Sequence, residues 1–412
     1  MSTAALALLI GAMIFGQVII FASITLWRRR REKIENHHID RDQSVAPGKS
    51  EQSAWQGFTP FRVVQRITEN LGGDICSFYL EPEEAIPLPR YKPGQFLTFK
   101  FDQLNPAKAG SVIRCYSLSD RYASTHYRIS VKRVAAPLDQ PTLLPGVVSN
   151  YLHDHVQVGD RLMVKAPSGH FHLSKESSLP VVLIAGGIGV TPMLSILNSL
   201  VEQGSEREIW FFYAVRNGRE VIMRQQLQSL ADLSPQVHLH LCFSRPDPED
   251  QAGVDFQHSG RIDMALLQRE LGFGRYQFYV CGPAAMMECI VPGLEQLGVQ
   301  AADIHYEAFG PATPARPQTE TTTAEVEESL QVIFSKSGRS SEWTGIADSL
   351  LSFIEAEGVD VSSGCRAGSC GSCQTLIEAG EVEYFQEPDV DVETGSCLLC
   401  VCRPKSDLKL AL

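Results

Sequence analysis

Short runs of alternating apolar and polar residues fill the stretch from Phe58 to about Phe171, and Pro and Gly residues separate them. In chain order the runs read FRVVQRI, CSFYL, GQFLTFKF, YRISVKRV and DRLMVKAP. An alternation with a period of two places successive side chains on opposite faces of a half-buried strand. The pattern therefore predicts an antiparallel sandwich or barrel in this part of the chain.

The pattern changes at PVVLIAGG, a continuous apolar run that leads into a helical stretch from Pro192 to Glu202. EIWFFYAV, VHLHLCF and YQFYVCG repeat the alternation of strand and helix. Continuous apolar strands are typical of parallel sheets that are covered on both faces, so a doubly wound α/β domain follows. After Phe309 the Pro- and Thr-rich run GPATPARPQTETTTAEVEE predicts a linker, and a last small domain runs from about Ser329 to Leu412.

The N-terminus carries a candidate membrane span. No charged side chain occurs before Arg28, and Ala4 to Trp27 would extend about 36 Å as a helix, enough to cross the apolar core of a bilayer. A cleaved signal peptide is the alternative, but it needs a basic region before the apolar stretch and a small-residue cleavage site after it. Here RRRR follows Trp27, so we expect a retained single-pass anchor, residues 1–27, with the later domains in the cytoplasm. The polar residues 28–54 are predicted to be a tether.

Composition narrows the possible partners. The 412 residues are 44% hydrophobic and 20% charged, values that fit two to four globular domains. The net charge is −12 and the main basic run is Arg28 to Arg31, so we expect no nucleic-acid partner. Six of the eleven cysteines lie in the last eighth of the chain, which indicates metal ligation in a reducing compartment rather than a disulfide scaffold.

The sequence SGCRAGSCGSCQT contains Cys365, Cys370 and Cys373 with the spacing C-x4-C-x2-C. This is the plant-type ferredoxin arrangement for a 2Fe-2S cluster. Its three glycines allow the loop to curl round a cluster and to turn backbone N–H groups toward the sulfurs. Structural zinc is the alternative, but zinc sites favour two C-x2-C pairs.

The fourth cluster ligand is open among Cys397, Cys400 and Cys402. In plant-type ferredoxins this ligand commonly precedes a proline by four positions, a resemblance that selects Cys400 in CVCRP and leaves Cys402 as a packed apolar side chain. A plant-type cluster has a potential of about −400 mV, which is low for reduction by a nicotinamide. We therefore expect amide hydrogen bonds in the loop to raise it.

RCYSLSD, residues Arg114 to Asp120, resembles the R-x-Y-S flavin signature of the ferredoxin-NADP reductase superfamily. The resemblance implies that Arg114 pairs with the flavin phosphate, that Tyr116 lies against the isoalloxazine, and that the catalytic Ser117 hydroxyl reaches the flavin N5. These roles suit the residue types, because arginine offers a bidentate donor fork and a donor at N5 tunes the hydride acceptor.

Two further motifs follow at the distances that this resemblance implies. GVVSNYLHD begins a helix near Gly146, where Ser149 and the neighbouring backbone N–H groups would meet a pyrophosphate. APSGHF, residues Ala166 to Phe171, resembles the end of the flavin domain in the FAD-binding branch of the superfamily. FAD is therefore the expected flavin, with FMN as the alternative, because FMN-using reductases share the R-x-Y-S motif and the domain order.

AGGIGVTPML joins a buried strand to a helix through three glycines, which permits close approach of the backbone to a pyrophosphate. CGPAAMM and HYEAFG resemble the superfamily's later motifs, which imply a catalytic cysteine by the nicotinamide and a catalytic acid and an aromatic residue near the flavin. FSRP lies where some members bind the 2′-phosphate of NADP, so the choice between NADH and NADPH stays open, leaning to NADH. The residues implied are Gly186, Gly187, Gly189, Thr191, Ser244, Arg245, Cys281, Gly282, Pro283, Glu307 and Phe309.

From about Trp55 to Leu412 the chain resembles the reductases that serve multicomponent oxygenases and the hybrid-cluster protein. The domains implied are a β-barrel FAD domain (55–175), an α/β NAD(P) domain (176–309), a linker (310–328) and an α+β, β-grasp ferredoxin domain (329–412). The resemblance implies an enzyme that moves electrons from NAD(P)H through FAD and a 2Fe-2S cluster to a partner protein.

We expect a membrane-bound hydroxylase or desaturase as the electron acceptor, a quinone next, and a soluble oxygenase last. One alternative is a terminal reductase of a small acceptor such as a quinone or ferric chelate. Another is a non-catalytic membrane scaffold, which the intact Arg114, Ser117 and Cys281 and the four thiols argue against.

Overall fold

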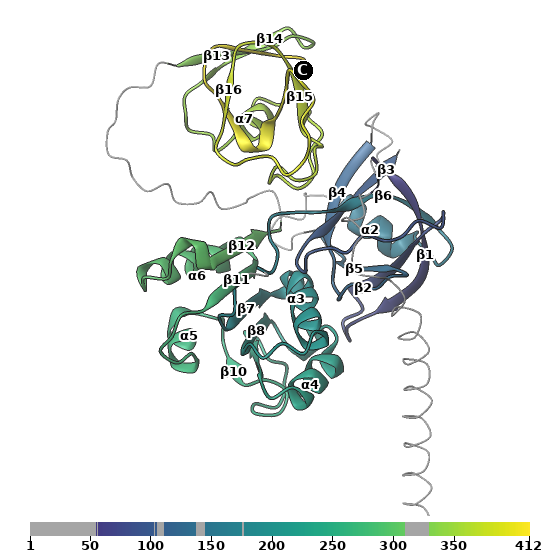
Figure 1. Ribbon diagram of the computed structural model, residues 1–412, viewed down its shortest axis with the longest axis vertical. Helices are drawn as coiled ribbons and strands as arrows, with labels where there is room; N and C mark the ends of the chain where they lie inside the picture. Colours follow the sequence, from purple (N-terminus) through teal and green to yellow (C-terminus); the bar gives the residue numbers. More distant parts are fainter. Residues whose placement is uncertain are drawn as a thin grey trace, which may run out of the picture. The chain divides into compact units, whose positions relative to one another are not determined.

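The computed structural model describes residues 55, 57–102, 104, 111–136, 145–174, 177–309 and 329–412 (Figure 1). The expected anchor and tether, residues 1–54, and the expected linker, residues 310–328, lie outside the described residues. Within the ranges just given, the structure has no helix long and apolar enough to cross a membrane.

The first domain is an antiparallel sheet with the strand order β4-β3-β6-β1-β2-β5. Leu118, just after β4, forms a bridge with Ile129 of β5, so the two edge strands meet and the sheet curls into a barrel. The expectation of an antiparallel flavin domain is confirmed. The strands are β1 (Thr59–Thr68), β2 (Ile75–Pro82), β3 (Phe96–Asp102), β4 (Ser111–Ser117), β5 (Tyr127–Lys132) and β6 (Arg161–Ser168).

Side-chain alternation builds the core of this barrel. In β1, Phe61 and Val63 are fully buried while Arg62 and Val64 are exposed, as the period of two requires. The one helix among the described residues of this domain, α2 (Val147–Asp154), adds Val148 and Leu152 to the same apolar core.

The second domain is a parallel sheet with the strand order β10-β9-β8-β7-β11-β12. The chain starts in the middle, at β7 (Val181–Gly186), and moves outward through β8 (Ile209–Val215), β9 (Val237–Phe243) and β10 (His258–Ser259). It then returns to the other side of β7 with β11 (Gln277–Gly282) and β12 (Ile304–Ala308). The strand order therefore reverses between β7 and β11, the position where open α/β sheets bind ligands.

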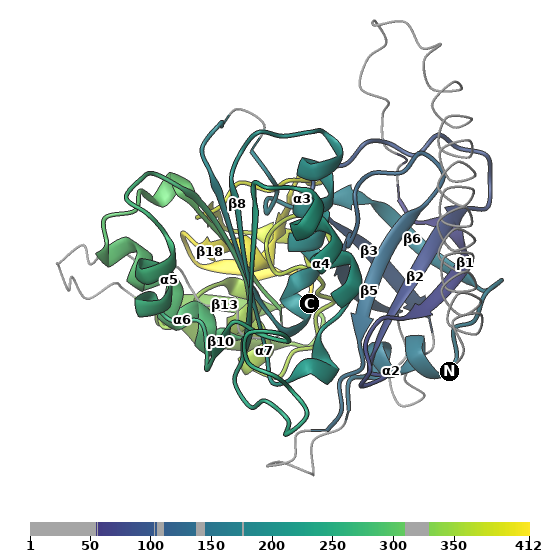
Figure 2. The same ribbon diagram turned by 90° about the horizontal axis from the view of Figure 1, so that it is seen from below.

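Helices cover both faces of this sheet, as the continuous apolar strands predicted. Figure 2 shows α3 (Val190–Glu202) and α4 (Arg224–Leu233) on one face and α5 (Met264–Glu270) and α6 (Ala284–Gln296) on the other. Two separate apolar clusters, one on each face, hold the helices to the strands. Short 3-10 helices complete the domain: η1 (Gly187–Gly189), η2 (Gly218–Glu220) and η3 (Ala301–Asp303).

The loops after β7 and β11 approach each other at three glycines. A Cβ atom on Gly189 would lie 2.2 Å from the carbonyl oxygen of Cys281, and one on Gly186 would lie 2.7 Å from Cδ of Pro283. A Cβ atom on Gly282 would lie 2.3 Å from Cε of Met286. At Gly189 the obstacle is backbone, so no residue with a side chain would fit there without moving the chain; at Gly186 and Gly282 the nearest atoms belong to the side chains of Pro283 and Met286.

The C-terminal domain combines a mixed sheet, ordered β14-β13-β19-β15-β17, with a separate antiparallel pair, β16-β18. Helix α7 (Leu350–Ala356) buries Leu350, Leu351 and Ile354 in the domain's apolar core. This arrangement agrees with the expected α+β ferredoxin-like domain. Its elements are β13 (Leu330–Phe334), β14 (Arg339–Trp343), β15 (Gln374–Ala379), β16 (Val382–Tyr384), β17 (Ser396–Leu398), η4 (Leu399–Val401), β18 (Cys402–Pro404) and β19 (Leu408–Leu410).

The packing of Gly189 predicts a marked loss of stability in Gly189→Ala. The added methyl group would overlap the Cys281 carbonyl, and relieving such an overlap costs about 1–3 kcal/mol. We expect Gly189→Ala to lower the melting temperature of the purified protein by several degrees in calorimetry. Gly272→Ala is the matched control, because its new Cβ atom would meet its nearest neighbour, the Tyr276 hydroxyl, at an ordinary 3.7 Å. Equal melting temperatures for the two variants would contradict the proposed close packing.

Candidate cofactor sites

Strand β4 carries the R-x-Y-S motif and exposes its residues unequally. The Arg114 side chain is exposed, and its Nη1 donates to the Ile113 carbonyl at 2.7 Å. The Tyr116 ring packs edge-on against Phe99, with 5.7 Å between centroids, and burial raises the pKa of its hydroxyl. Ser117 is buried, and its Oγ has no hydrogen-bond partner among the described residues.

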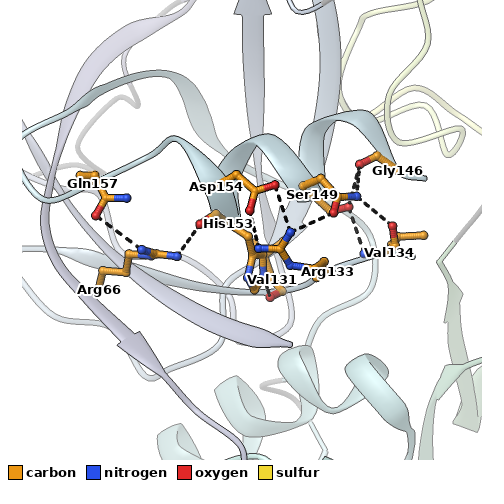
Figure 3. A network of polar contacts seen from close by, with 10 residues as sticks. Arg66, Val131, Arg133, Val134, Gly146, Ser149, His153, Asp154 and Gln157 are labelled. Carbon is orange, nitrogen blue, oxygen red and sulfur yellow. Dashed lines mark hydrogen bonds and ion pairs between the residues drawn. The ribbon is translucent and has the colours of Figure 1, made fainter. Parts of the chain in front are cut away.

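The start of helix α2 is held by its own side chains (Figure 3). The Ser149 hydroxyl donates to the Gly146 carbonyl and accepts from the Val134 N–H, both at 3.2 Å. The Asn150 amide donates to the same Gly146 carbonyl at 2.7 Å. The Ser149 hydroxyl is thus engaged within the fold, and the first-turn backbone N–H groups, which have no partner inside a helix, are what this end offers to an anion.

A glycine is required at position 146 for a steric reason. A Cβ atom there would lie 2.7 Å from the Ser149 Oγ and 2.9 Å from the Val134 Cβ. Arg133 holds the other end of the helix through its ion pair with Asp154, with 2.6 Å between Nη2 and Oδ1 (Figure 3). The helix therefore has a fixed entry angle before any ligand binds.

The sheet's reversal point gathers the predicted nicotinamide motifs. Gly186 ends β7, Gly187 has a left-handed φ of +54°, and α3 begins directly after Gly189. Pro283 precedes α6, whose first turn is uncapped by any described side chain. The Thr191 hydroxyl donates to the Ile188 carbonyl at 3.0 Å, so it stabilises the turn.

Cys281 and Glu307 are direct neighbours in the register of β11 and β12. Cys281 is fully buried, and this burial is the main reason that the pKa of its thiol is raised. The nearby Glu307 carboxyl raises the pKa further. Burial raises the pKa of the Glu307 carboxyl to about 8. The residue keeps some exposed surface, but its Oε2 is buried and has no hydrogen-bond partner in the described part of the chain. The Cys281 thiol and the Glu307 carboxyl therefore both favour their neutral forms, and both lie at the carboxyl edge of the parallel sheet.

The unpartnered Ser117 Oγ and Glu307 Oε2 fit the roles that a flavin would give them. A buried polar atom without a partner costs about 1–3 kcal/mol, and a ligand that bonds to it would remove that cost. Each belongs to a residue implied by a flavin motif, one from the barrel and one from the parallel sheet. The residues present are therefore compatible with a flavin bound by both domains.

Three other implied residues are exposed. Ser244 follows β9, and both its N–H and its hydroxyl donate to the Val215 carbonyl, at 3.0 and 3.3 Å. The exposed Arg245 donates its backbone N–H to the Arg216 carbonyl at 2.7 Å. Phe309 follows β12 and is 40% exposed. All three lie at the carboxyl edge of the sheet, where a coenzyme would bind.

The cysteine loop brings four sulfurs together. Cys400 is in side-chain contact with both Cys365 and Cys373, and these two thiols and burial raise its pKa. Cys370 is in side-chain contact with Cys365. Four N–H groups donate to the sulfurs, each at 3.3 Å: Ala367 and Ser369 to Cys365, Gly368 to Cys400, and Cys365 to Cys370. This thiol set fits a 2Fe-2S cluster and includes the amide donors expected from the sequence.

The other two cysteines of the cluster region face each other. Cys397 and Cys402 are fully buried, and contact with the Cys397 thiol raises the pKa of Cys402. Cys400, by contrast, contacts Cys365 and Cys373 of the motif. These contacts favour Cys400 as the fourth ligand, which stays a prediction.

Three family models match this chain. An oxidoreductase FAD-binding domain matches residues 61–173, an oxidoreductase NAD-binding domain matches 183–291, and a 2Fe-2S iron-sulfur cluster binding domain matches 341–405. The flavohemoprotein of Halalkalibacterium halodurans is 38% identical over 292 residues, covering 69% of this chain and 68% of the relative. The chain belongs to the FAD- and NAD-binding oxidoreductases of the ferredoxin-NADP reductase superfamily.

This oxidoreductase is also similar to a second flavohemoprotein and to a reductase of known structure. The flavohemoprotein of Bacillus cereus (strain ATCC 10987 / NRS 248) is 41% identical over 261 residues, and this chain spans 63% of its length. A solved structure of phthalate dioxygenase reductase has 28% sequence identity and a TM-score of 0.52, and the match covers 86% of this chain and 98% of that one. That reductase has a modular structure for electron transfer from pyridine nucleotides to a 2Fe-2S centre. The match to the FAD-binding model supports the expectation of FAD.

Sequence reasoning missed the contacts between the cluster loop and the flavin domain of this oxidoreductase. The Lys165 Nζ donates to the Cys370 carbonyl at 3.0 Å, and the Gly169 N–H donates to the Asp389 carboxylate at 3.1 Å. The Cys115 thiol, inside the R-x-Y-S motif, contacts the Cys370 thiol, which raises the Cys115 pKa. Lys165 and Cys370 are 205 positions apart, so no local pattern could reveal the pair.

The buried Glu307 carboxyl predicts a pH-dependent stability in the flavin-free oxidoreductase. Its pKa rises from 4.5 to about 8 on folding, so between these values the folded chain keeps a proton that the unfolded chain has lost. The stability of the wild type relative to Glu307→Gln should therefore fall as the pH rises through this window and level off above it. Melting temperatures of both proteins across the window provide the measurement. Parallel curves would contradict the raised pKa, and Glu295→Gln on α6 controls for loss of a surface carboxylate.

Proposed function

We propose that this oxidoreductase takes electrons from NAD(P)H and delivers them, through FAD and its 2Fe-2S centre, to a partner oxygenase, hydroxylase or desaturase. One observation carries the proposal: four convergent thiols with amide donors stand in the same chain as the two-domain flavin and nicotinamide scaffold. A chain with that combination could accept a hydride at the flavin and pass single electrons on from the cluster.

The chain's own residues position and tune the cofactors. When bound, the flavin accepts an electron pair from the nicotinamide and releases single electrons, which the cluster can carry. Arg114 would hold flavin phosphate, and the α2 amides would meet the pyrophosphate. The Ser117 hydroxyl and the protonated Glu307 would offer hydrogen bonds within the flavin site, and the glycine loops after β7 and β11 would admit the nicotinamide coenzyme.

The first test follows the two redox centres in the purified chain. NADH or NADPH should bleach both flavin and 2Fe-2S absorbance, and the two irons of one cluster should be present per chain. Cys400→Ser should remove the paramagnetic signal of the reduced cluster and leave flavin reduction nearly intact, because the flavin residues lie in other domains. Cys402→Ala should leave both signals, because Cys402 contacts Cys397 rather than the other sulfurs.

Several outcomes would overturn this assignment. Stoichiometric zinc without iron would exclude the cluster, and a flavin that neither coenzyme reduces would exclude the reductase. Loss of the cluster in Cys402→Ala but not in Cys400→Ser would show that Cys402, and not Cys400, is the fourth ligand. Chromatography of the heat-released flavin decides between FAD and FMN.

The proposal includes a membrane anchor at residues 1–27 that keeps the reductase beside a membrane-bound acceptor. Ala4 to Trp27 carries no ionisable side chain that would line an ion path, so attachment is the simplest role. A 27-residue tether, coiled, would reach about 30 Å and give effective concentrations up to about millimolar for a partner in the same membrane.

Removal of the anchor separates attachment from chemistry. A chain of residues 55–412 should reduce a one-electron dye at the full-length rate, because every implied cofactor residue lies beyond Trp55. Electron delivery to membranes that contain the partner should fall by one or more orders of magnitude at low enzyme concentration, as loss of the effective concentration requires. Equal turnover with the two chains would reject the anchoring role and favour a soluble acceptor. Turnover with a quinone or ferric chelate alone would identify a terminal reductase.

A further inference from the structure

Three potential metal ligands meet at the outer edge of the parallel sheet, where Figure 1 labels β10 and α5. They are His240 of β9, His258 of β10 and Glu270 at the end of α5. One ligand atom from each lies within 4.8 Å of the other two. None of the three belongs to the residues implied in flavin, nicotinamide or cluster binding.

The strand register explains why the two histidines meet. His258 pairs with Cys242 in the parallel ladder of β10 and β9, and His240 lies two residues before Cys242 on the same face. Their side chains are therefore diagonal neighbours, with 2.9 Å between His240 Nδ1 and His258 Nε2. The rings are nearly coplanar, at 19°.

Aromatic packing fixes the position of His240. Its ring stacks on Phe212 with 4.6 Å between centroids and a 15° interplanar angle, and on Trp210 at 5.7 Å. This packing holds the ring with its Nδ1 directed at His258.

The hydrogen bonds define the proton positions in the metal-free arrangement. Arg269 Nη2 lies 3.3 Å from His258 Nδ1, and because arginine can only donate, that nitrogen accepts. His258 therefore carries its proton on Nε2 and donates it to His240 Nδ1. Arg269 also pairs with Glu270, with 2.9 Å between Nε and Oε1. Arg269 thus occupies both His258 and Glu270.

We propose that His240, His258 and Glu270 form a binding site for a divalent transition-metal ion of the zinc class, with water completing a tetrahedral shell. Two imidazoles and one carboxylate suit zinc, whereas calcium and magnesium favour oxygen ligands alone. On binding, the His258 proton moves from Nε2 to Nδ1, Arg269 withdraws, and the ion takes the place between the two rings. No proton is released from the imidazoles.

Such an ion would add a cross-link to three elements that are otherwise held by a two-residue strand pairing, between β9 and β10, and by apolar packing between β9 and α5. It would tie β10 and α5 to β9, and with them the segment from Ser244 to Gln257, which includes Arg245. The site would therefore stabilise the edge of the sheet that carries the predicted 2′-phosphate contacts.

Zinc titration of the full-length protein, with its flavin and cluster loaded, tests the site. Calorimetry should find one zinc ion per chain beyond any bound at cysteines, and zinc-edge X-ray absorption should show nitrogen and oxygen neighbours. His240→Gln and His258→Gln should each weaken the affinity at least tenfold. Arg269→Met should strengthen it several-fold, because it removes the competitor for His258 and Glu270.

A matched control lies on the same strand. His238 stacks on Trp210 with 4.2 Å between centroids but is outside the ligand group, so His238→Gln should leave the affinity unchanged. Flavin content and melting temperature verify that each variant is folded, and Glu270→Gln provides a conservative third ligand change. A sulfur-only shell, the absence of binding at micromolar zinc, or equal affinity in the wild type and the His240→Gln/His258→Gln double variant would overturn the proposal.

Discussion

The geometry of the nicotinamide domain depends on two backbones that lie closer together than any side chain would allow. The Cys281 carbonyl occupies the space that a Cβ atom of residue 189 would fill, at 2.2 Å. This contact holds the end of β11 against the 3-10 turn that precedes α3, at the point where the strand order reverses. Cys281 and its register partner Glu307 lie one residue before the ends of β11 and β12, at the same carboxyl edge. The glycine-containing loops after β7 and β11 thus meet in one shared contact and depend on each other.

A second constraint comes from two of the eight buried side-chain atoms that lack a hydrogen-bond partner among the described residues. The Ser117 Oγ and Glu307 Oε2 each carry a cost of about 1–3 kcal/mol until something bonds to them. The fold keeps both atoms buried, although the serine and carboxyl could have been paired by neighbouring backbone groups, as Ser149 and Thr191 are. Hydrogen bonds from a bound flavin would remove these costs, and that gain would contribute to the free energy of flavin binding.

Sequence patterns anticipated the element types well and individual side-chain roles less well. The period-two runs predicted strands such as β1, and the continuous run of β7 predicted a strand buried on both faces. The hydroxyl of Ser149 was expected at a pyrophosphate, but a motif cannot show that it already bonds to Gly146 and Val134. His240 and His258 escaped notice because only the register of β9 with β10 makes them neighbours. Contacts that depend on strand pairing or on the packing of one domain against another join residues far apart in the sequence, so no local motif predicts them.

The cluster loop shows how one such tertiary contact supports redox chemistry. Arg366 has a left-handed φ of +57°, which costs an L-residue about 1–2 kcal/mol. Its guanidinium is held by Glu355 of α7, with 2.6 Å between Nη2 and Oε1, and α7 is buried in the domain core. This conformation helps to aim the Ala367, Gly368 and Ser369 N–H groups at the cysteine sulfurs. Reduction adds negative charge to a cluster, and N–H donors stabilise that charge. On a bound cluster these donors would therefore act in the direction expected from the sequence, toward a higher potential.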